Sequence, residues 1–162
     1  MKLRNTAIAA ALSLIPVGQP LVIGTGAALT TSAVMLSIAG KAQAESAEFY
    51  FERALKKQNE EGDYYGAISD YNKVIEKKEV STNNLATTYY NRGKAKSDIK
   101  DYKGALSDFN KTLQITPDDE MVYGSRGFAK MYLDDRRGGC ADWRKASSLG
   151  YENATKWVKE TC

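Results

Sequence analysis

Two cysteines and an absence of histidine define the chemistry open to this chain of 162 residues. Cys140 lies in the stretch GGCADWRK, and Cys162 is the last residue. Without imidazole there is no Ser–His–Asp or Cys–His nucleophile pair and no histidine general base. A zinc site would have to combine two thiolates with carboxylates, which is an unusual ligand set. We therefore expect no metal and no cofactor, and ask whether the cysteines are paired, free or reactive.

Pairs of a carboxylate and an ammonium group also recur along the chain, three residues apart. They are Asp70/Lys73, Asp108/Lys111 and Asp142/Lys145. Residues at this spacing on a helix surface form solvent-exposed pairs, so their recurrence indicates architecture and not an active site. We expect a protein without enzymatic activity. The alternative is an enzyme that uses Ser, Lys or carboxylate chemistry in a closed pocket on a helical scaffold.

The charge distribution argues against a nucleic-acid partner. The formal net charge is +3, but Lys2, Arg4 and Lys41 precede the first acidic residue, Glu45. Removing these three from the 23 basic residues leaves 20, which balance the 20 acidic ones. A neutral body lacks the clustered basic surface that nucleic-acid binding requires. We expect a protein or peptide partner and make no prediction of oligomeric state.

The first 44 residues have the layout of an export signal. Lys2 and Arg4 precede a long apolar run, which ends at Ala42-Gln43-Ala44. This is a charged start, an apolar region and an A-x-A cleavage site. The run is longer than most signals, and residues 21–40 are long enough to span a membrane, so a retained anchor is the alternative. Both interpretations place residues 45–162 outside the cytoplasm, in a periplasm, a lumen or the extracellular space, and any membrane contact within residues 1–44.

Internal repeats organise the rest of the chain. The stretch YYNRGKAK starts at Tyr89 and YGSRGFAK starts at Tyr123, an offset of 34 residues. ALSDFNK from Ala105 and GCADWRK from Gly139 have the same offset, and AISDYNK from Ala67 is a third copy. A fixed period of this length is typical of stacked structural repeats.

These stretches resemble the tetratricopeptide repeat (TPR) family, whose unit has 34 residues and two helices. The resemblance implies an all-α, right-handed α-solenoid of three helix-turn-helix repeats, at about 48–81, 86–119 and 120–153. Arg92 and Arg126 depart from the family, which usually has Leu there, and Lys96 and Lys130 stand where it often has Tyr. In repeat one, Leu55 occupies the expected glycine position, and residues 82–85 separate this repeat from the next.

The apolar pattern supports this organisation. Tyr71, Phe109 and Trp143 lie on apolar stripes at helical spacing, which predicts buried core residues. Asp63 and Asp101 are placed to cap the second helices of their repeats. Residues 151–162 form a further amphipathic segment, and a repeat stack needs a terminal element over its last open face. We therefore expect a capping helix there.

The resemblance also implies where a partner binds. The family's concave surface is lined from the first helix of each repeat, and this surface carries the expected partner-binding groove. In this chain it implies Phe49, Glu52 and Lys56 from repeat one, Tyr90, Lys94 and Asp98 from repeat two, and Phe128, Met131 and Tyr132 from repeat three. We expect a groove with a hydrophobic end at repeat three, unless the capping helix covers Phe128 and Met131.

Some family members clamp a C-terminal carboxylate with Lys and Asn in the first helix, Asn in the third, and Lys and Arg in the fifth. This chain has Asn91 at the middle position, but Glu52 and Lys56 in the first helix and Met121 and Ser125 in the fifth. The clamp is largely missing, so recognition of chaperone tails is not expected. A non-catalytic scaffold, adaptor or assembly factor is the predicted function, with a membrane-anchored subunit of a larger complex as the alternative.

The repeat organisation answers the question about the cysteines. Cys140 lies 11 residues before Tyr151 and Cys162 lies 11 after it. Two antiparallel helices that leave one turn place such residues side by side, each about 16 Å from the turn. This separation suits a disulfide, which an oxidising compartment favours. We expect a Cys140–Cys162 disulfide; two free buried thiols and a reactive or metal-bound Cys140 are the alternatives.

Overall fold

The computed structural model describes residues 21–23, 27–29, 46–77 and 80–162. The chain divides into two units, residues 1–43 and 44–162, which are treated separately. In the first unit, β1 (Leu21–Ile23) pairs with β2 (Ala27–Leu29) in antiparallel register, with Val22 opposite Ala28. The rest of the expected signal or anchor lies outside the described residues. Within the described part of the chain, no helix is long and apolar enough to cross a membrane.

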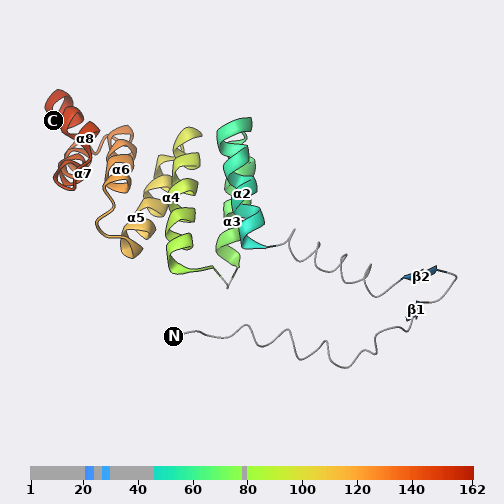
Figure 1. Cartoon of the computed structure of the whole chain (residues 1–162). Helices are drawn as coiled ribbons and strands as arrows, with labels where there is room; N and C mark the ends of the chain where they lie inside the picture. Colours follow the sequence, from blue (N-terminus) through green and yellow to red (C-terminus); the bar gives the residue numbers. More distant parts are fainter. Residues whose placement is uncertain (1–20, 24–26, 30–45, 78–79) are drawn as a thin grey trace, which may run out of the picture. The chain divides into compact units, whose positions relative to one another are not determined.

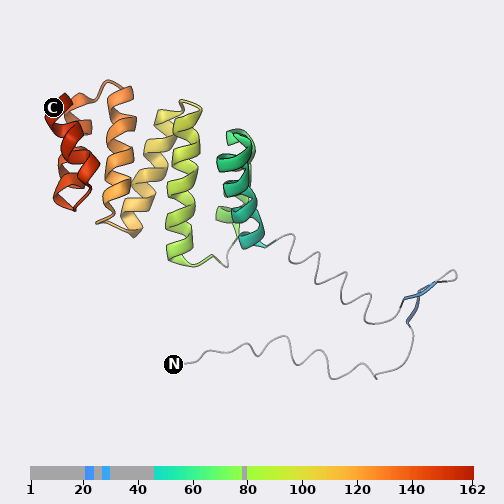
Figure 2. The same ribbon diagram turned by 45° about the horizontal axis from the view of Figure 1, so that its top comes forward.

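The second unit is built from helices that follow one another as antiparallel pairs (Figure 1). Their bounds are α2 Ala47–Lys56, α3 Tyr64–Glu76, α4 Thr82–Asp98, α5 Tyr102–Ile115, α6 Glu120–Tyr132, α7 Arg136–Ser148 and α8 Glu152–Thr161, with a π-helical segment η2 (Lys57–Glu61) after α2. A second view shows the pairs side by side in chain order (Figure 2). From residue 46 onward, three helix pairs and a terminal helix confirm the all-α repeat fold expected from the sequence.

The turn within each repeat is fixed by one aspartate. Asp63, Asp101 and Asp135 precede α3, α5 and α7, and each side chain accepts a hydrogen bond of 2.9 Å from the backbone N–H of the glycine three residues on. This satisfies a donor that would otherwise be unpaired at the helix start. The predicted caps at Asp63 and Asp101 are confirmed, and Asp135 is a third.

The predicted core aromatics are buried between the two helices of each repeat. Tyr71, Phe109 and Trp143 are each at most 3% exposed. A Cβ atom added at Gly93 would lie 2.7 Å from the ring of Phe109, and one at Gly127 would overlap Trp143. The glycines are therefore needed for the close approach of α4 to α5 and of α6 to α7.

Repeat one contains an additional residue, which η2 absorbs. The interval from Arg53 to the cap Asp63 is ten residues, whereas those from Arg92 to Asp101 and from Arg126 to the third cap are nine. A π-helical turn accommodates such an insertion within a helix. Consequently Ala54, which is fully buried, occupies the place of the packing glycines. The assignment of Leu55 to that place, and the repeat boundary at residue 48, are each one residue late.

A second correction concerns residues 82–85. They do not separate the repeats but form the first turn of α4, with Ser81 as the cap accepting from the Asn84 N–H. The first helix of repeat two is therefore 17 residues long, against 13 for its counterpart α6.

The terminal helix covers the open face of the last repeat. Ala154 is fully buried, and Trp157 and Val158 pack against the cluster around Trp143 and Ala146. A disulfide joins Cys140 in α7 to Cys162 after α8, with a Cα–Cα distance of 5.8 Å. The bond fastens the end of α8 to the start of α7.

Candidate functional site

The three repeated aspartates are buried, contrary to the exposed pairs expected from their spacing. Asp70, Asp108 and Asp142 are at most 5% exposed. Each carboxylate accepts two hydrogen bonds from an arginine on the preceding helix, and the pairs are Arg53–Asp70, Arg92–Asp108 and Arg126–Asp142, at 2.6–2.9 Å. The lysine three residues on is a weak partner, since even Lys73 lies 3.9 Å from Asp70.

A second cation completes each cluster. Lys57, Lys96 and Lys130, one turn after each arginine, lie 2.8–3.0 Å from the same carboxylate. The arginines also link successive repeats, because Arg92 donates to Asn72 at 2.6 Å and Arg126 donates to Asn110 at 2.7 Å. The family departures at residues 92, 96, 126 and 130 are thus parts of one ion cluster that recurs in every repeat.

These clusters are structural and leave no free reactive group. The hydrogen bonds from Arg53 hold the pKa of Asp70 below its ordinary value, so the carboxylate is stabilised in its charged form. Among the described side chains, no buried nitrogen or oxygen lacks a hydrogen-bond partner. The same part of the chain contains no group of three or more Cys, Asp or Glu residues placed to bind a metal.

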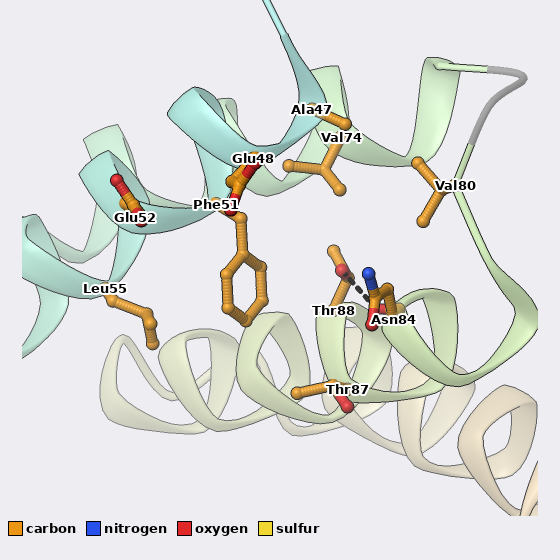
Figure 3. A pocket seen from close by; sticks show the side chains of 10 residues that line it. All are labelled: Ala47, Glu48, Phe51, Glu52, Leu55, Val74, Val80, Asn84, Thr87 and Thr88. Atoms are coloured by element: carbon orange, nitrogen blue, oxygen red, sulfur yellow. Dashed lines mark hydrogen bonds between the residues drawn. The ribbon is translucent and has the colours of Figure 1, made fainter. Parts of the chain in front are cut away.

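The candidate site is a pocket of about 560 Å³ between α2 and α4 (Figure 3). Its apolar lining comes from Ala47, Phe51, Leu55, Val74 and Val80, and its polar lining from Glu48, Glu52, Asn84, Thr87 and Thr88. Figure 3 shows Phe51 and Leu55 pointing from α2 toward α4, with Val74 and Val80 at the other end of the space. A volume of this size and a mostly apolar lining are typical of sites that bind a ligand or a partner's side chain.

The pocket depends on local features of the sequence. The early start of α4 places Asn84, Thr87 and Thr88 on one side of the pocket, and Phe51 and Leu55 line the side formed by α2. The side chain of Thr88 donates to the Asn84 carbonyl at 2.6 Å, so its hydroxyl is satisfied within α4. Apolar carbon therefore dominates the floor of the pocket.

The structure brings one of the three predicted groove residues of repeat one into this pocket. Glu52 lines it. Phe49 instead packs on Tyr50, with ring centroids 5.6 Å apart, and Lys56 is paired with Glu61 at 3.8 Å. The physical reason is that repeat one begins one residue earlier than predicted. The inner-face positions predicted for Phe49, Glu52 and Lys56 are therefore occupied by Glu48, Phe51 and Leu55.

The predicted residues of repeat two lie further along α4. Tyr90 is half-buried against Phe109, and burial raises its pKa. Lys94 lies 5.8 Å from the centre of the Tyr90 ring, and its charge partly offsets the rise in the pKa of Asp98 caused by burial. These three side chains continue the face of α4 beyond the pocket.

The predicted hydrophobic end at repeat three is only partly covered. Phe128 is 37% exposed and lies edge-on to Trp143 and Trp157. Its ring centroid is 4.5 Å from that of Trp157 on α8. Met131 packs against α7, where its side chain leaves no room for a Cβ atom at position 139. Tyr132 remains 65% exposed and stacks on Tyr102. Trp157 of the capping helix contacts Phe128, but Phe128 and Tyr132 remain exposed at this end of the repeat stack.

Sequence reasoning missed Phe51 and Leu55. The signal was present, because the intervals from Arg53 to Asp63 and from Arg92 to Asp101 differ by one residue. Aligning the repeats on their arginines gives Phe51 and Leu55 as the equivalents of Tyr90 and Lys94.

Comparison with solved structures identifies the fold of residues 46 onward. The first TPR of Spaghetti (RPAP3), bound to the HSP90 peptide SRMEEVD, is 22% identical at a TM-score of 0.64, and the match covers 73% of this chain and 91% of that chain. The Arabidopsis OM64 TPR domain is 24% identical at a TM-score of 0.64, and the match covers 71% of this chain and 93% of that domain. Cut9–Hcn1, an APC/C hetero-tetramer, is 16% identical at 0.69, covering 78% of this chain and 25% of that one. No protein-family model matches the sequence, and no curated protein does. The described helices have the tetratricopeptide repeat fold.

Proposed function

We propose that this protein is a non-catalytic interaction module that binds a segment of a partner protein in the pocket between α2 and α4. The observation that carries the proposal is the apolar pocket itself, formed by Phe51, Leu55 and Val74 on a rigid helical scaffold. Solved TPR domains similar to this chain bind peptides, including one bound to an HSP70 peptide. Their mode of action supports a peptide-binding role here.

The partner segment differs from the acidic tails that those domains bind. With the register corrected, Phe51 and Leu55 stand where the carboxylate clamp of the family requires Lys and Asn. Met121 and Ser125 replace the clamp residues of the fifth helix, and Asn91 alone is retained. An apolar pocket without these cations cannot neutralise a terminal carboxylate and its acidic neighbours.

Site-specific crosslinking tests the proposal. A photo-reactive amino acid at position 55 should form an adduct with one identified partner in the native host, and the same group at position 152 on α8 should not. The adduct should disappear when Phe51→Ala is added, because the pocket wall is lost. Equal adducts from both positions, or an adduct indifferent to Phe51, would refute binding in this pocket.

We further propose that the module acts outside the cytoplasm as a scaffold, adaptor or assembly factor. The charged start, the apolar run and the A-x-A site of residues 1–44 support export, and the Cys140–Cys162 disulfide suits an oxidising compartment. The mass of the protein isolated from native cells tests this. A chain beginning at Glu45 supports cleavage, and retention of residues 1–44 in membranes supports an anchored subunit.

A further inference from the structure

Resting on the proposed function, we infer the chemistry of the partner segment: an apolar side chain with basic neighbours. The apolar side chain enters between Phe51 and Leu55, and the neighbouring cations contact Glu48 and Glu52. The inference uses the composition of the pocket and the placement of charge around it.

The apolar requirement follows from the walls. Phe51, Leu55 and Val80 are half-buried, and Val74 is 2% exposed, so the space between them is bounded by carbon. Phe51 is held from behind by Tyr71, with ring centroids 6.0 Å apart, so the wall is fixed before a partner arrives. A polar side chain in this space would lose its hydrogen bonds to water without replacement.

The charge requirement follows from the rim. Among the described lining residues, the charged ones are Glu48 and Glu52, both exposed and one helical turn apart on α2. The cations nearest along α2 are engaged elsewhere: Arg53 and Lys57 bind Asp70, and Lys56 is paired with Glu61. Two carboxylates above an apolar floor favour a segment that places a cation on each side of its apolar residue.

The opposite wall suits an extended backbone. Asn84 and Thr87 are exposed on α4, and both line the pocket (Figure 3). The Asn84 amide can both donate to and accept from a peptide group. These contacts are independent of sequence, so the selectivity comes from the apolar floor and the acidic rim.

Peptide titrations of the full chain, uniformly labelled with ¹⁵N, test the inference by NMR. The probe is acetyl-Gly-Lys-Leu-Lys-Gly-amide, and the matched peptides replace both Lys by Glu, or Leu by Ser. We expect the Lys-Leu-Lys peptide to shift the amide signals of residues 48–55 and 84–88. Each ion pair at an exposed rim contributes about 3- to 5-fold in affinity, so it should bind about tenfold more tightly than the Glu-Leu-Glu peptide.

Charge reversal provides the decisive variant. The double variant Glu48→Lys/Glu52→Lys should bind the Glu-Leu-Glu peptide more tightly than the Lys-Leu-Lys peptide, the reverse of wild type. In 0.5 M salt, the difference in affinity between the two peptides should become smaller for both proteins. The control Glu152→Lys/Glu160→Lys makes the same charge change at exposed positions on α8 and should leave the order unchanged.

The outcomes separate this inference from the proposed function. Equal binding of the Lys and Glu peptides, or an order that the rim variant does not exchange, overturns the basic requirement. Tight binding of the Ser peptide overturns the apolar requirement. If none of the peptides shifts residues 48–55 while the position-55 crosslink persists, this inference fails and the interaction function stands.

Discussion

The replacement Asp108→Asn tests whether the buried ion clusters hold the repeats together. Asp108 is 1% exposed, and its partners Arg92 and Lys96 have side chains that are 12% and 18% exposed. Asparagine keeps the volume but leaves both cations without a countercharge. Removing one partner from a buried pair costs about 3–5 kcal/mol, because the remaining charge is uncompensated.

The equivalent change in repeat one gives an internal scale. Asp70 is as buried as Asp108, but Arg53 is 37% exposed and Lys57 24%, so water can solvate both cations when the carboxylate is neutralised. We expect Asp70→Asn to cost about 1–2 kcal/mol, between the values for exposed and buried pairs. The order of the two variants is the specific prediction.

Urea unfolding followed by helical circular dichroism measures both costs. With a slope of about 2 kcal/mol per molar urea, Asp108→Asn should lower the midpoint by about 2 M. Adding Arg92→Leu and Lys96→Tyr, the residues usual in the family, should recover at least half of the loss by removing the unpaired cations. A loss for Asp108→Asn no larger than that for Asp70→Asn would refute the reasoning.

Three further predictions concern the fold. Because the hydrogen bonds from Arg53 lower the pKa of Asp70, this carboxylate stabilises the folded state above its unfolded pKa of about 3.9 and loses that effect as the pH falls through the folded pKa. The urea midpoints of wild type and Asp70→Asn should therefore converge below about pH 4. The midpoint of the control Asp118→Asn should follow that of wild type at every pH. Cys140→Ser/Cys162→Ser should lower stability by about 3 kcal/mol, since the bridge closes a loop of sequence separation 22, and treating the wild type with reductant should reproduce the loss in thermal melts. Lys100 has a φ of 65°, where side chains are disfavoured, so Lys100→Gly should raise the urea midpoint by an amount corresponding to about 0.5–1 kcal/mol, while Lys103→Gly, within α5, should lower it.

Much of the fold was predicted from the sequence because the repeats carry residues whose type and spacing indicate one structural role each. The 34-residue offset, the buried aromatics and the aspartate caps are each marked by residue types at fixed local spacings, so they can be read from the sequence. The candidate site was less accessible, because one additional residue in repeat one shifts every inner-face position. A π-helical turn has no composition of its own, so Phe51 and Leu55 emerge when the repeats are aligned on Arg53 and Arg92.

The ion clusters were not predicted for a different reason. The i, i+3 interval relates residues on one helix, whereas Arg92 on α4 and Asp108 on α5 meet across a turn. Arg92 and Asp108 lie eight residues on either side of Lys100, and Arg126 and Asp142 lie eight on either side of Asp134. Both central residues have positive φ and mark the turn between antiparallel helices. The argument that pairs Cys140 with Cys162 across residue 151 therefore also pairs Arg92 with Asp108 and Arg126 with Asp142. For a helical repeat of this kind, equidistance from a turn is a better guide to charge pairing than the i, i+3 interval.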